Sequence, residues 1–188
     1  MRKPISKKML LTLIQQFVAV DSVGTSAVRG QPAGTVLAIR KYLGMMNLDR
    51  LPRNDRQDFA RWLDLHTGRI QRKLPNRRRP WGIARKTLNL FLRSCFYTHE
   101  LRKAYGMAKA ARRLEVPLDS LVAKGLREDA GKHNVRLPRW RGLKRLTPVE
   151  SEEFQKHARE YAAGCKLPAP VFLDNYLWLR GRGGGSAR

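Results

Sequence analysis

Residues 77–97 read RRRPWGIARKTLNLFLRSCFY. The stretch begins as a basic loop and continues as a long amphipathic helix, which we expect to start between Pro80 and Ile83 and to run toward Tyr105. At about 100° per residue, its apolar side chains fall on one face of that helix. These side chains belong to Leu88, Phe91, Leu92, Cys95, Phe96 and His99. One long helix with a continuous apolar face predicts a helical core built around it.

The opposite side of this helix is polar and carries Lys86, Asn89, Arg93 and Tyr97. Residues 114–122 then read LEVPLDSLV, in which the proline suits the first turn of a further helix. Asp119 would lie at the positive end of the dipole of that helix. Two interpretations of this carboxylate stay open at this point: a plain helix cap, or a partner for the lysine of the preceding helix.

The chain is strongly basic, with 39 Lys and Arg against 15 Asp and Glu and a formal net charge of +24. Such a charge indicates the kind of partner rather than the fold. Between Leu65 and His99 the chain has nine Lys or Arg and no acidic residue. Cations this dense repel one another, so the run favours phosphate contact over simple solubility. Nucleic acid is the favoured partner, and an anionic membrane surface or an acidic protein is the alternative.

The remainder of the chain is also predicted to be helical, and no strand pattern or internal repeat is evident. We expect a single all-α domain over residues 1–180, arranged as a helical bundle, and a flexible basic tail over residues 181–188. A first helix is expected at Ile5–Val20, with Leu10, Leu13, Ile14 and Phe17 on its buried face. Two more are expected near Thr35–Met46 and from an N-cap at Asn54 to Pro75. The last two are expected to begin at the capping box Thr147-Pro148-Val149-Glu150 and to lie around Phe172–Trp178.

Several classes of protein are disfavoured by what the sequence lacks. No apolar run approaches the roughly 18 residues of a membrane span. Cys95 and Cys165 form no C-x-x-C pair, and the histidines show no metal-ligand spacing. We therefore expect free buried thiols in a reducing compartment, no metal, no small-molecule cofactor and no membrane partner. A cytoplasmic, nucleoid-associated or nuclear location is the matching expectation.

A second basic segment covers residues 132–145, KHNVRLPRWRGLKR, and again contains no carboxylate. Trp140 lies between Arg139 and Arg141, so an aromatic plate is flanked by positive charge. Such a plate can stack on a base or wedge into a duplex. It can equally anchor the segment on the core, and the sequence leaves both interpretations open.

Residues 82–89, GIARKTLN, resemble the GVGRKTAN run of the helix–hairpin–helix DNA glycosylase superfamily, which includes the endonuclease III-like and 8-oxoguanine glycosylase enzymes. In that family the lysine of the run is the Schiff-base nucleophile of the bifunctional members, and it matches Lys86. The family's V-P-V-D signature resembles residues 116–119, VPLD, so its catalytic carboxylate matches Asp119. The resemblance covers about residues 80–126, a quarter of the chain.

The sequence departs from the family pattern in the hairpin. Where the family has L-P-G-V-G, this chain has R-R-R-P-W-G and then Ala84 in place of the second hairpin glycine, with Arg77 to Arg79 as a substitute phosphate grip. The gap between Lys86 and Asp119 is similar to that of archaeal 8-oxoguanine glycosylases. No cysteine cluster follows, which excludes the iron–sulfur subtype.

The resemblance implies an all-α protein with a helix–hairpin–helix-like DNA-binding element and a base-excision DNA glycosylase with abasic-site lyase chemistry. Its partner would be double-stranded DNA, damaged or abasic, and an oxidised purine is the favoured lesion. The residues expected to contact nucleic acid are Arg77, Arg78, Arg79, Arg85, Asn89, Arg93, Arg139, Trp140, Arg141 and Lys144. The alternative is a non-catalytic DNA- or RNA-binding subunit of a larger assembly, the ribosome included, in which Lys86 is one more phosphate contact and Asp119 one more cap.

Overall fold

The computed structural model describes residues 4–75 and 79–182, and within these ranges every regular element is a helix. The α-helices are α1 (Lys7–Ser22), α2 (Thr35–Gly44), α3 (Arg56–Gln71), α4 (Trp81–Tyr97), α5 (His99–Ala104), α6 (Ser120–Lys132), α7 (Pro148–Gly164) and α8 (Phe172–Arg182). Short 3-10 helices cover Thr25–Val28, Leu48–Arg50 and Met107–Arg113. The predicted all-α fold is confirmed. Most of the predicted basic tail, residues 183–188, lies outside the described residues.

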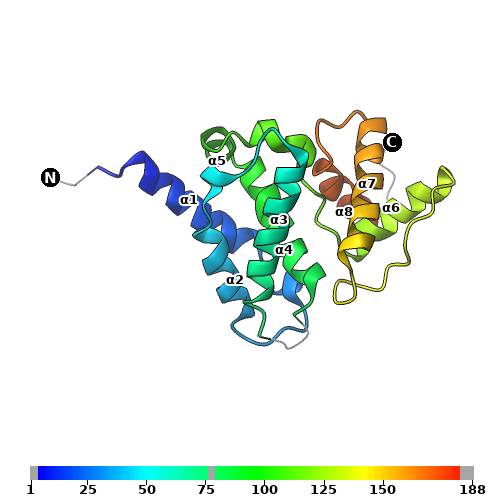
Figure 1. The fold of residues 1–188 in the computed structure, drawn as a ribbon, viewed down its shortest axis with the longest axis horizontal. Coiled ribbons are helices and arrows are strands. Elements are labelled where there is room, and N and C mark those ends of the chain that lie inside the picture. The colour runs from blue at the N-terminus through cyan, green and yellow to red at the C-terminus, as the bar shows by residue number, and fades with distance from the viewer. Residues whose placement is uncertain (1–3, 76–78, 183–188) are drawn as a thin grey trace.

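The hydrophobic core divides into two clusters (Figure 1). The N-terminal cluster is built by α1 to α5 and includes Ile39, Leu63 and Phe91, each at most 2% exposed. The C-terminal cluster is built by α6 to α8 together with the segment that precedes α6, and it includes Phe154 and Leu173. Helix α4 contacts α1 and α3 on one side and α7 on another, so it joins the two clusters.

Helix α4 has the predicted apolar face but ends earlier than expected. Phe91 and Cys95 are fully buried, and truncating a buried phenylalanine typically costs about 3–5 kcal/mol. The helix stops at Tyr97 because Thr98 takes an extended conformation (φ −78°, ψ 115°), after which α5 starts. His99 is therefore an exposed residue of α5 and not part of the buried face, which corrects the prediction.

The polar side of α4 is covered, although we expected it to face away from the core. Asn89 is only 2% exposed, and Lys86, Arg93 and Tyr97 are partly buried. The C-terminal cluster lies over this side of the helix and supplies the carboxylate of Asp174 as a partner for Arg93. A polar helix face is exposed to solvent only when no other element covers it with groups of opposite charge.

Helix α1 buries a different face from the one predicted. Leu10, Leu13 and Phe17 are 48%, 46% and 71% exposed, so the predicted core face is largely solvent-exposed. The buried residues are Gln15, Val18, Ala19 and Ser22. A glutamine occupies the buried face because its amide donates to Leu43 O at 2.9 Å and to Met46 O at 2.8 Å, which satisfies carbonyls at the end of α2.

The helix starts follow local capping signals with small differences. The predicted capping box of α7 is confirmed: Thr147 Oγ1 accepts from Glu150 N, and Thr147 N donates to the Glu150 carboxylate. The N-cap of α3 is Asp55 and not Asn54. Pro117 precedes α6, whose N-cap is Asp119 itself.

The two cysteines are free, but only one is buried as expected. Cys95 lies in the N-terminal cluster, where burial raises the pKa of its thiol well above the ordinary value. Cys165 is exposed at the end of α7. Over residues 4–75 and 79–182, no helix combines the length and the apolar character that crossing a membrane requires.

Candidate functional site

Lys86 and Asp119 come together at the junction of the two clusters. Lys86 lies in the second turn of α4, and its Nζ is 3.3 Å from Asp119 Oδ2, although the two residues are 33 positions apart in the chain. The two side chains are 12% and 23% exposed. Asp119 Oδ1 accepts from the backbone N–H groups of Leu121 and Val122, each at 3.0 Å. One carboxylate oxygen therefore caps α6 while the other faces the lysine amine.

The segment that carries Asp119 is fixed in place by a buried amide. Gln155 of α7 accepts from Val116 N at 2.9 Å and donates to Val116 O at 2.8 Å. The side chains of Val116 and Leu118 are buried in the C-terminal cluster. This paired hydrogen bonding holds the backbone rigidly just before the N-cap, so the position of the Asp119 carboxylate relative to α4 is set by α7.

Arg85 is buried next to this pair and has carboxylate partners of its own. Its side chain is 8% exposed. It donates from Nε to Glu115 Oε2 at 2.8 Å and from Nη2 to Glu115 Oε1 at 2.9 Å, which is a bidentate pair. Nη1 donates to Asp64 and to Thr67, each at 3.0 Å. Asn89 also donates to Glu115, at 2.8 Å.

These contacts correct the expectation that Arg85 and Asn89 touch phosphate. Both side chains are turned into the protein toward Glu115, the one carboxylate between Glu100 and Asp119 in the sequence. Arg93 is likewise engaged, in an ion pair with the buried carboxylate of Asp174 in α8, and burial lowers the pKa of its guanidinium. The three side chains join α4 to the C-terminal cluster, so they fix the frame in which Lys86 and Asp119 meet.

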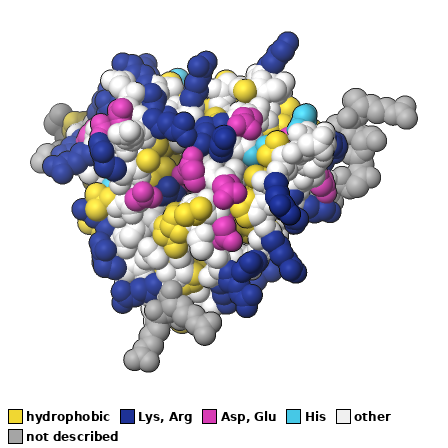
Figure 2. Space-filling view, turned by 45° about the vertical axis from the view of Figure 1, so that its right-hand side comes forward, with side chains coloured by type: hydrophobic (Ala, Val, Ile, Leu, Met, Phe, Trp, Pro, Cys, Tyr) yellow, Lys and Arg dark blue, Asp and Glu magenta, His cyan; other side chains and the backbone are white. Residues whose placement is uncertain are grey.

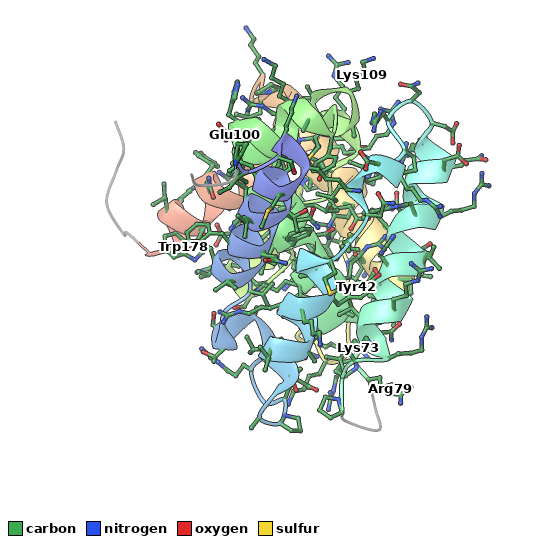
Figure 3. All side chains as sticks on the ribbon, turned by 90° about the vertical axis from the view of Figure 1, so that its left-hand side faces the viewer. Tyr42, Lys73, Arg79, Glu100, Lys109 and Trp178 are labelled. Atoms are coloured by element: carbon green, nitrogen blue, oxygen red, sulfur yellow. The ribbon has the colours of Figure 1, made fainter. Side chains whose placement is uncertain are left out.

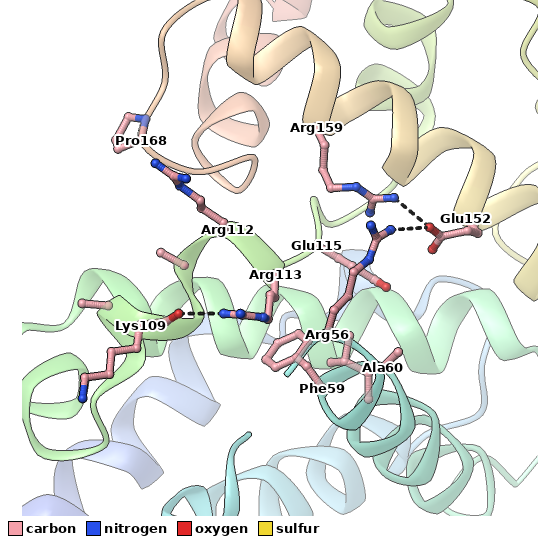
Figure 4. A pocket seen from close by; sticks show the side chains of 13 residues that line it. Arg56, Phe59, Ala60, Lys109, Arg112, Arg113, Glu115, Glu152, Arg159 and Pro168 are labelled. Atoms are coloured by element: carbon pink, nitrogen blue, oxygen red, sulfur yellow. Dashed lines mark hydrogen bonds and ion pairs between the residues drawn. The ribbon is translucent and has the colours of Figure 1, made fainter. Parts of the chain in front are cut away.

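A cleft runs between the two clusters beside this buried network (Figure 4). Glu115 lines it, and Glu152 of α7 lies across it. The Glu152 carboxylate accepts from Arg56 of α3 at 3.3 Å and from Arg159 at 2.7 Å. On the face shown in Figure 2, Asp and Glu side chains gather near the middle, whereas Lys and Arg side chains project around the edge. Glu115 and Glu152 thus bring two carboxylates to the cleft between the clusters.

The basic segment 132–145 lies directly on the start of α4. A Cβ on Gly82 would meet Leu143 O and would lie 2.9 Å from Leu146 Cβ, so only glycine permits this approach. Trp140 is partly buried and packs edge-on against Phe154, with ring centroids 5.8 Å apart at 90°. This contact matches the interpretation in which Trp140 anchors the basic segment on the core, rather than the one in which it stacks on a base.

The exposed cations of this segment border a hollow without carboxylates. Arg29, Arg141, Lys144 and Arg145 line this hollow of about 500 Å³, which we name the basic groove. Arg139 is also exposed. The hollow lies between the loop at Gly30 and the basic segment, and Ile83 in the first turn of α4 lines it as well. Anionic groups of a ligand would therefore meet several cations here and no competing acid.

The remaining predicted contacts lie in the connection between α3 and α4. Arg77 and Arg78 lie outside the described residues, whereas Gly82 and Ala84, which match the hairpin glycines of the family, lie in the first turn of α4. Arg79 is exposed, has φ 34°, and its carbonyl accepts from Gln71 Nε2 at 2.9 Å. Figure 3 shows it at the same end of the molecule as Lys73 in that view.

Sequence reasoning missed the residues that support the site, chiefly Glu115, Gln155, Asp174 and Arg29. Glu115 carried a detectable signal, because an isolated carboxylate precedes the V-P-L-D motif directly within an otherwise basic region. Gln155, Asp174 and Arg29 carry no such signal in the sequence. The partners of Gln155 and Asp174 are 39 or more residues away, and Arg29 meets the basic segment from another loop. Among the described residues, no three His, Cys, Asp or Glu side chains are grouped so that they could hold a metal ion.

Comparison of the chain with protein-family models, with curated proteins and with solved structures finds no match.

Proposed function

We propose that this protein is a DNA-binding base-excision glycosylase with abasic-site lyase activity. The observation that carries the proposal is the contact of Lys86 Nζ with Asp119 Oδ2 at 3.3 Å, made by two distant segments in a partly buried position. A nucleophilic amine needs a group that takes its proton, and the free oxygen of this carboxylate faces it. The similarity of residues 82–89 and 116–119 to the glycosylase motifs adds support.

The proposed reaction uses both groups at one sugar carbon. As the bond from C1′ to the base breaks, its electron pair leaves with the base, and the Asp119 carboxylate stabilises the positive charge that develops on the sugar. The Lys86 amine then forms a bond to C1′, which removes this positive charge from the sugar, and the proton that its nitrogen loses passes to the carboxylate. The carboxyl group returns this proton to the ring oxygen as the C1′–O4′ bond breaks, which gives an iminium ion at C1′. Loss of a proton from C2′ and departure of the 3′ phosphate complete β-elimination.

The basic groove supplies the proposed phosphate contacts on the same face of α4. Gly82 and Lys86 are four residues apart, so they share a helix face and are separated by about 6 Å along the axis. The basic segment reaches the first turn of α4 at Gly82, and the exposed cations Arg141 and Lys144 belong to this segment. A duplex held there would present its backbone beside the reactive pair, and a base must leave the stack to reach it.

A second candidate function is favoured by one specific observation. Lys86 is only 12% exposed, and its contact with Asp119 joins α4 to α6, so the pair would also serve as a purely structural link. The protein would then bind DNA or RNA without chemistry through the basic groove, in keeping with a net charge of +24.

Borohydride trapping on a duplex with one abasic site separates the two candidates. We expect a covalent adduct with the wild-type protein, none with Lys86→Gln, and much less with Asp119→Asn, which keeps an N-cap of similar quality but removes the charge. Lys124→Gln is the matched control, because Lys124 is 75% exposed on α6 and pairs with Glu128 of the same helix. A wild-type protein that binds the duplex but forms no adduct, and releases no base from duplexes with oxidised purines, would support the non-catalytic candidate.

A further inference from the structure

A second hollow lies between α2 and α3, away from Lys86. The residues that line it come only from positions 38–50 and 62–73, so neither α4 nor any later helix contributes to it among the described residues. Its volume is about 640 Å³, within the range of about 300–1,000 Å³ that is usual for small-molecule sites. Tyr42 and Lys73, two of its lining residues, are labelled in Figure 3. We name this feature the aromatic hollow.

The floor of the aromatic hollow is formed by three rings. The rings of Trp62 and His66 have centroids 4.2 Å apart, and those of Tyr42 and His66 are 6.0 Å apart. The side chains of Met45 and Leu65 form apolar walls and are 72% and 50% exposed. The ring planes of Trp62 and His66 are tilted by 43° and those of Tyr42 and His66 by 46°, so the floor offers aromatic surface to one ring of a ligand rather than one continuous flat plate.

A hydrogen bond joins two polar groups of the floor. The Tyr42 hydroxyl is 2.5 Å from His66 Nδ1, and Arg69 of the rim acts on both groups through its charge. Burial and the charge of Arg69 lower the pKa of His66 to about 4, so its ring is neutral at pH 7. The floor is therefore aromatic and uncharged, and the charges of the hollow lie on its rim.

The rim of the aromatic hollow is cationic. Lys41, Arg50, Arg69 and Lys73 line it, and the lining residues include no Asp or Glu. None of these four side chains forms an ion pair with a carboxylate anywhere in residues 4–75 and 79–182. Four unpaired cations around an aromatic floor indicate a ligand that combines a flat ring with negative charge.

We propose that the aromatic hollow binds a nucleoside phosphate, with the base on the ring floor and the phosphate on the cationic rim. The ligand is either a free nucleotide or one unpaired nucleotide of a single strand, since bases inside a duplex are stacked and hidden. An acidic peptide would satisfy the rim, but the Asp and Glu side chains that contact the rim offer no ring to the floor. The site is independent of the Lys86–Asp119 pair, so its failure would leave the proposed glycosylase function untouched.

The test measures calorimetric binding of three probes to the full chain at fixed salt: AMP, inorganic phosphate and a single-stranded thymidine hexanucleotide. The double variant Arg69→Gln/Lys73→Gln removes two rim charges. The double variant Arg61→Gln/Lys124→Gln removes the same charge from exposed positions that do not line the hollow. Tyr42→Leu removes a floor ring. Thermal unfolding of each variant establishes that it is folded.

We expect the rim variant to weaken AMP or hexanucleotide binding at least tenfold relative to the charge-matched control, and Tyr42→Leu to weaken it about fivefold or more while leaving inorganic phosphate unaffected. Loss of hexanucleotide binding alone identifies a strand as the source of the nucleotide, and loss of AMP binding identifies a free nucleotide. Equal affinities of the rim variant and its control for every probe would overturn the proposal. So would a tight phosphate site that is insensitive to Tyr42→Leu and does not prefer AMP.

Discussion

Replacing Arg85 by methionine perturbs the buried ion pair that joins α4 to the segment before α6. Methionine keeps the volume of the arginine stem but removes a guanidinium that makes four hydrogen bonds, two of them to Glu115. The Glu115 side chain is only 9% exposed, and the Asn89 amide would remain as a side-chain donor to it. Removing one partner of a buried pair typically costs about 3–5 kcal/mol, because the other charge stays buried without compensation.

The expected loss is large enough to measure directly. Every 1.4 kcal/mol changes an equilibrium constant tenfold, so a loss of about 3–5 kcal/mol shifts the folding equilibrium constant roughly 100-fold to 4,000-fold. Urea unfolding followed by circular dichroism gives the free energy, and an unchanged slope against urea shows that the folded state stays compact. Arg61→Met is the matched control: its partner is Asp58 on the same helix, and both side chains are more than half exposed, so about 0.2–1 kcal/mol is expected.

The double variant Arg85→Met/Glu115→Gln makes the argument specific. It removes both charges while the new amide oxygen can still accept from Asn89, so we expect it to regain at least half of the loss seen with Arg85→Met. Two outcomes would refute the reasoning: a cost for Arg85→Met no larger than for Arg61→Met, or a double variant whose cost equals the sum of the two single substitutions.

Three further predictions concern other parts of the molecule. Gly82→Ala should destabilise the protein by about 1–3 kcal/mol and weaken duplex binding, since its methyl group would displace the backbone at Leu143; urea unfolding and fluorescence anisotropy check this. Phe17→Ser should change the unfolding free energy by less than about 0.5 kcal/mol, because Phe17 is 71% exposed, whereas Val18→Ser, at 6% exposed, should cost about 1.5–3 kcal/mol. The folded state lowers the pKa of His66 from 6.5 to about 4, so the unfolded state binds the proton first; stability should fall as pH decreases from 6.5 toward 4, and less steeply in His66→Gln.

Each of these has a contrary outcome. An unchanged unfolding midpoint for Gly82→Ala would mean that the basic segment does not lie on α4. A larger loss for Phe17→Ser than for Val18→Ser would restore the predicted face of α1. Identical pH profiles for the wild-type protein and His66→Gln would mean that the imidazole is not held neutral in the folded state.

The sequence by itself determined the features that depend on neighbouring residues. The apolar face of α4 follows from a 3.6-residue period, and the capping box at Thr147 follows from two side chains three positions apart. The capping role of Asp119 was likewise available as one of two interpretations, because a carboxylate directly before a helix is a local signal. Such features do not depend on tertiary packing, so the all-α fold was predictable.

Only the tertiary structure decided which polar groups meet. Lys86 and Asp119 are brought together because α7 packs on α4 and holds the segment that precedes α6, and the same segment brings Glu115 to Arg85. Helical period assigned Lys86 and Arg93 to a face turned away from the core, and it assigned Phe17 to the core. The reason is that helical periodicity shows only whether a helix face is polar or apolar. Whether that face is buried depends on which other element covers it, and this is decided by contacts between segments far apart in the chain.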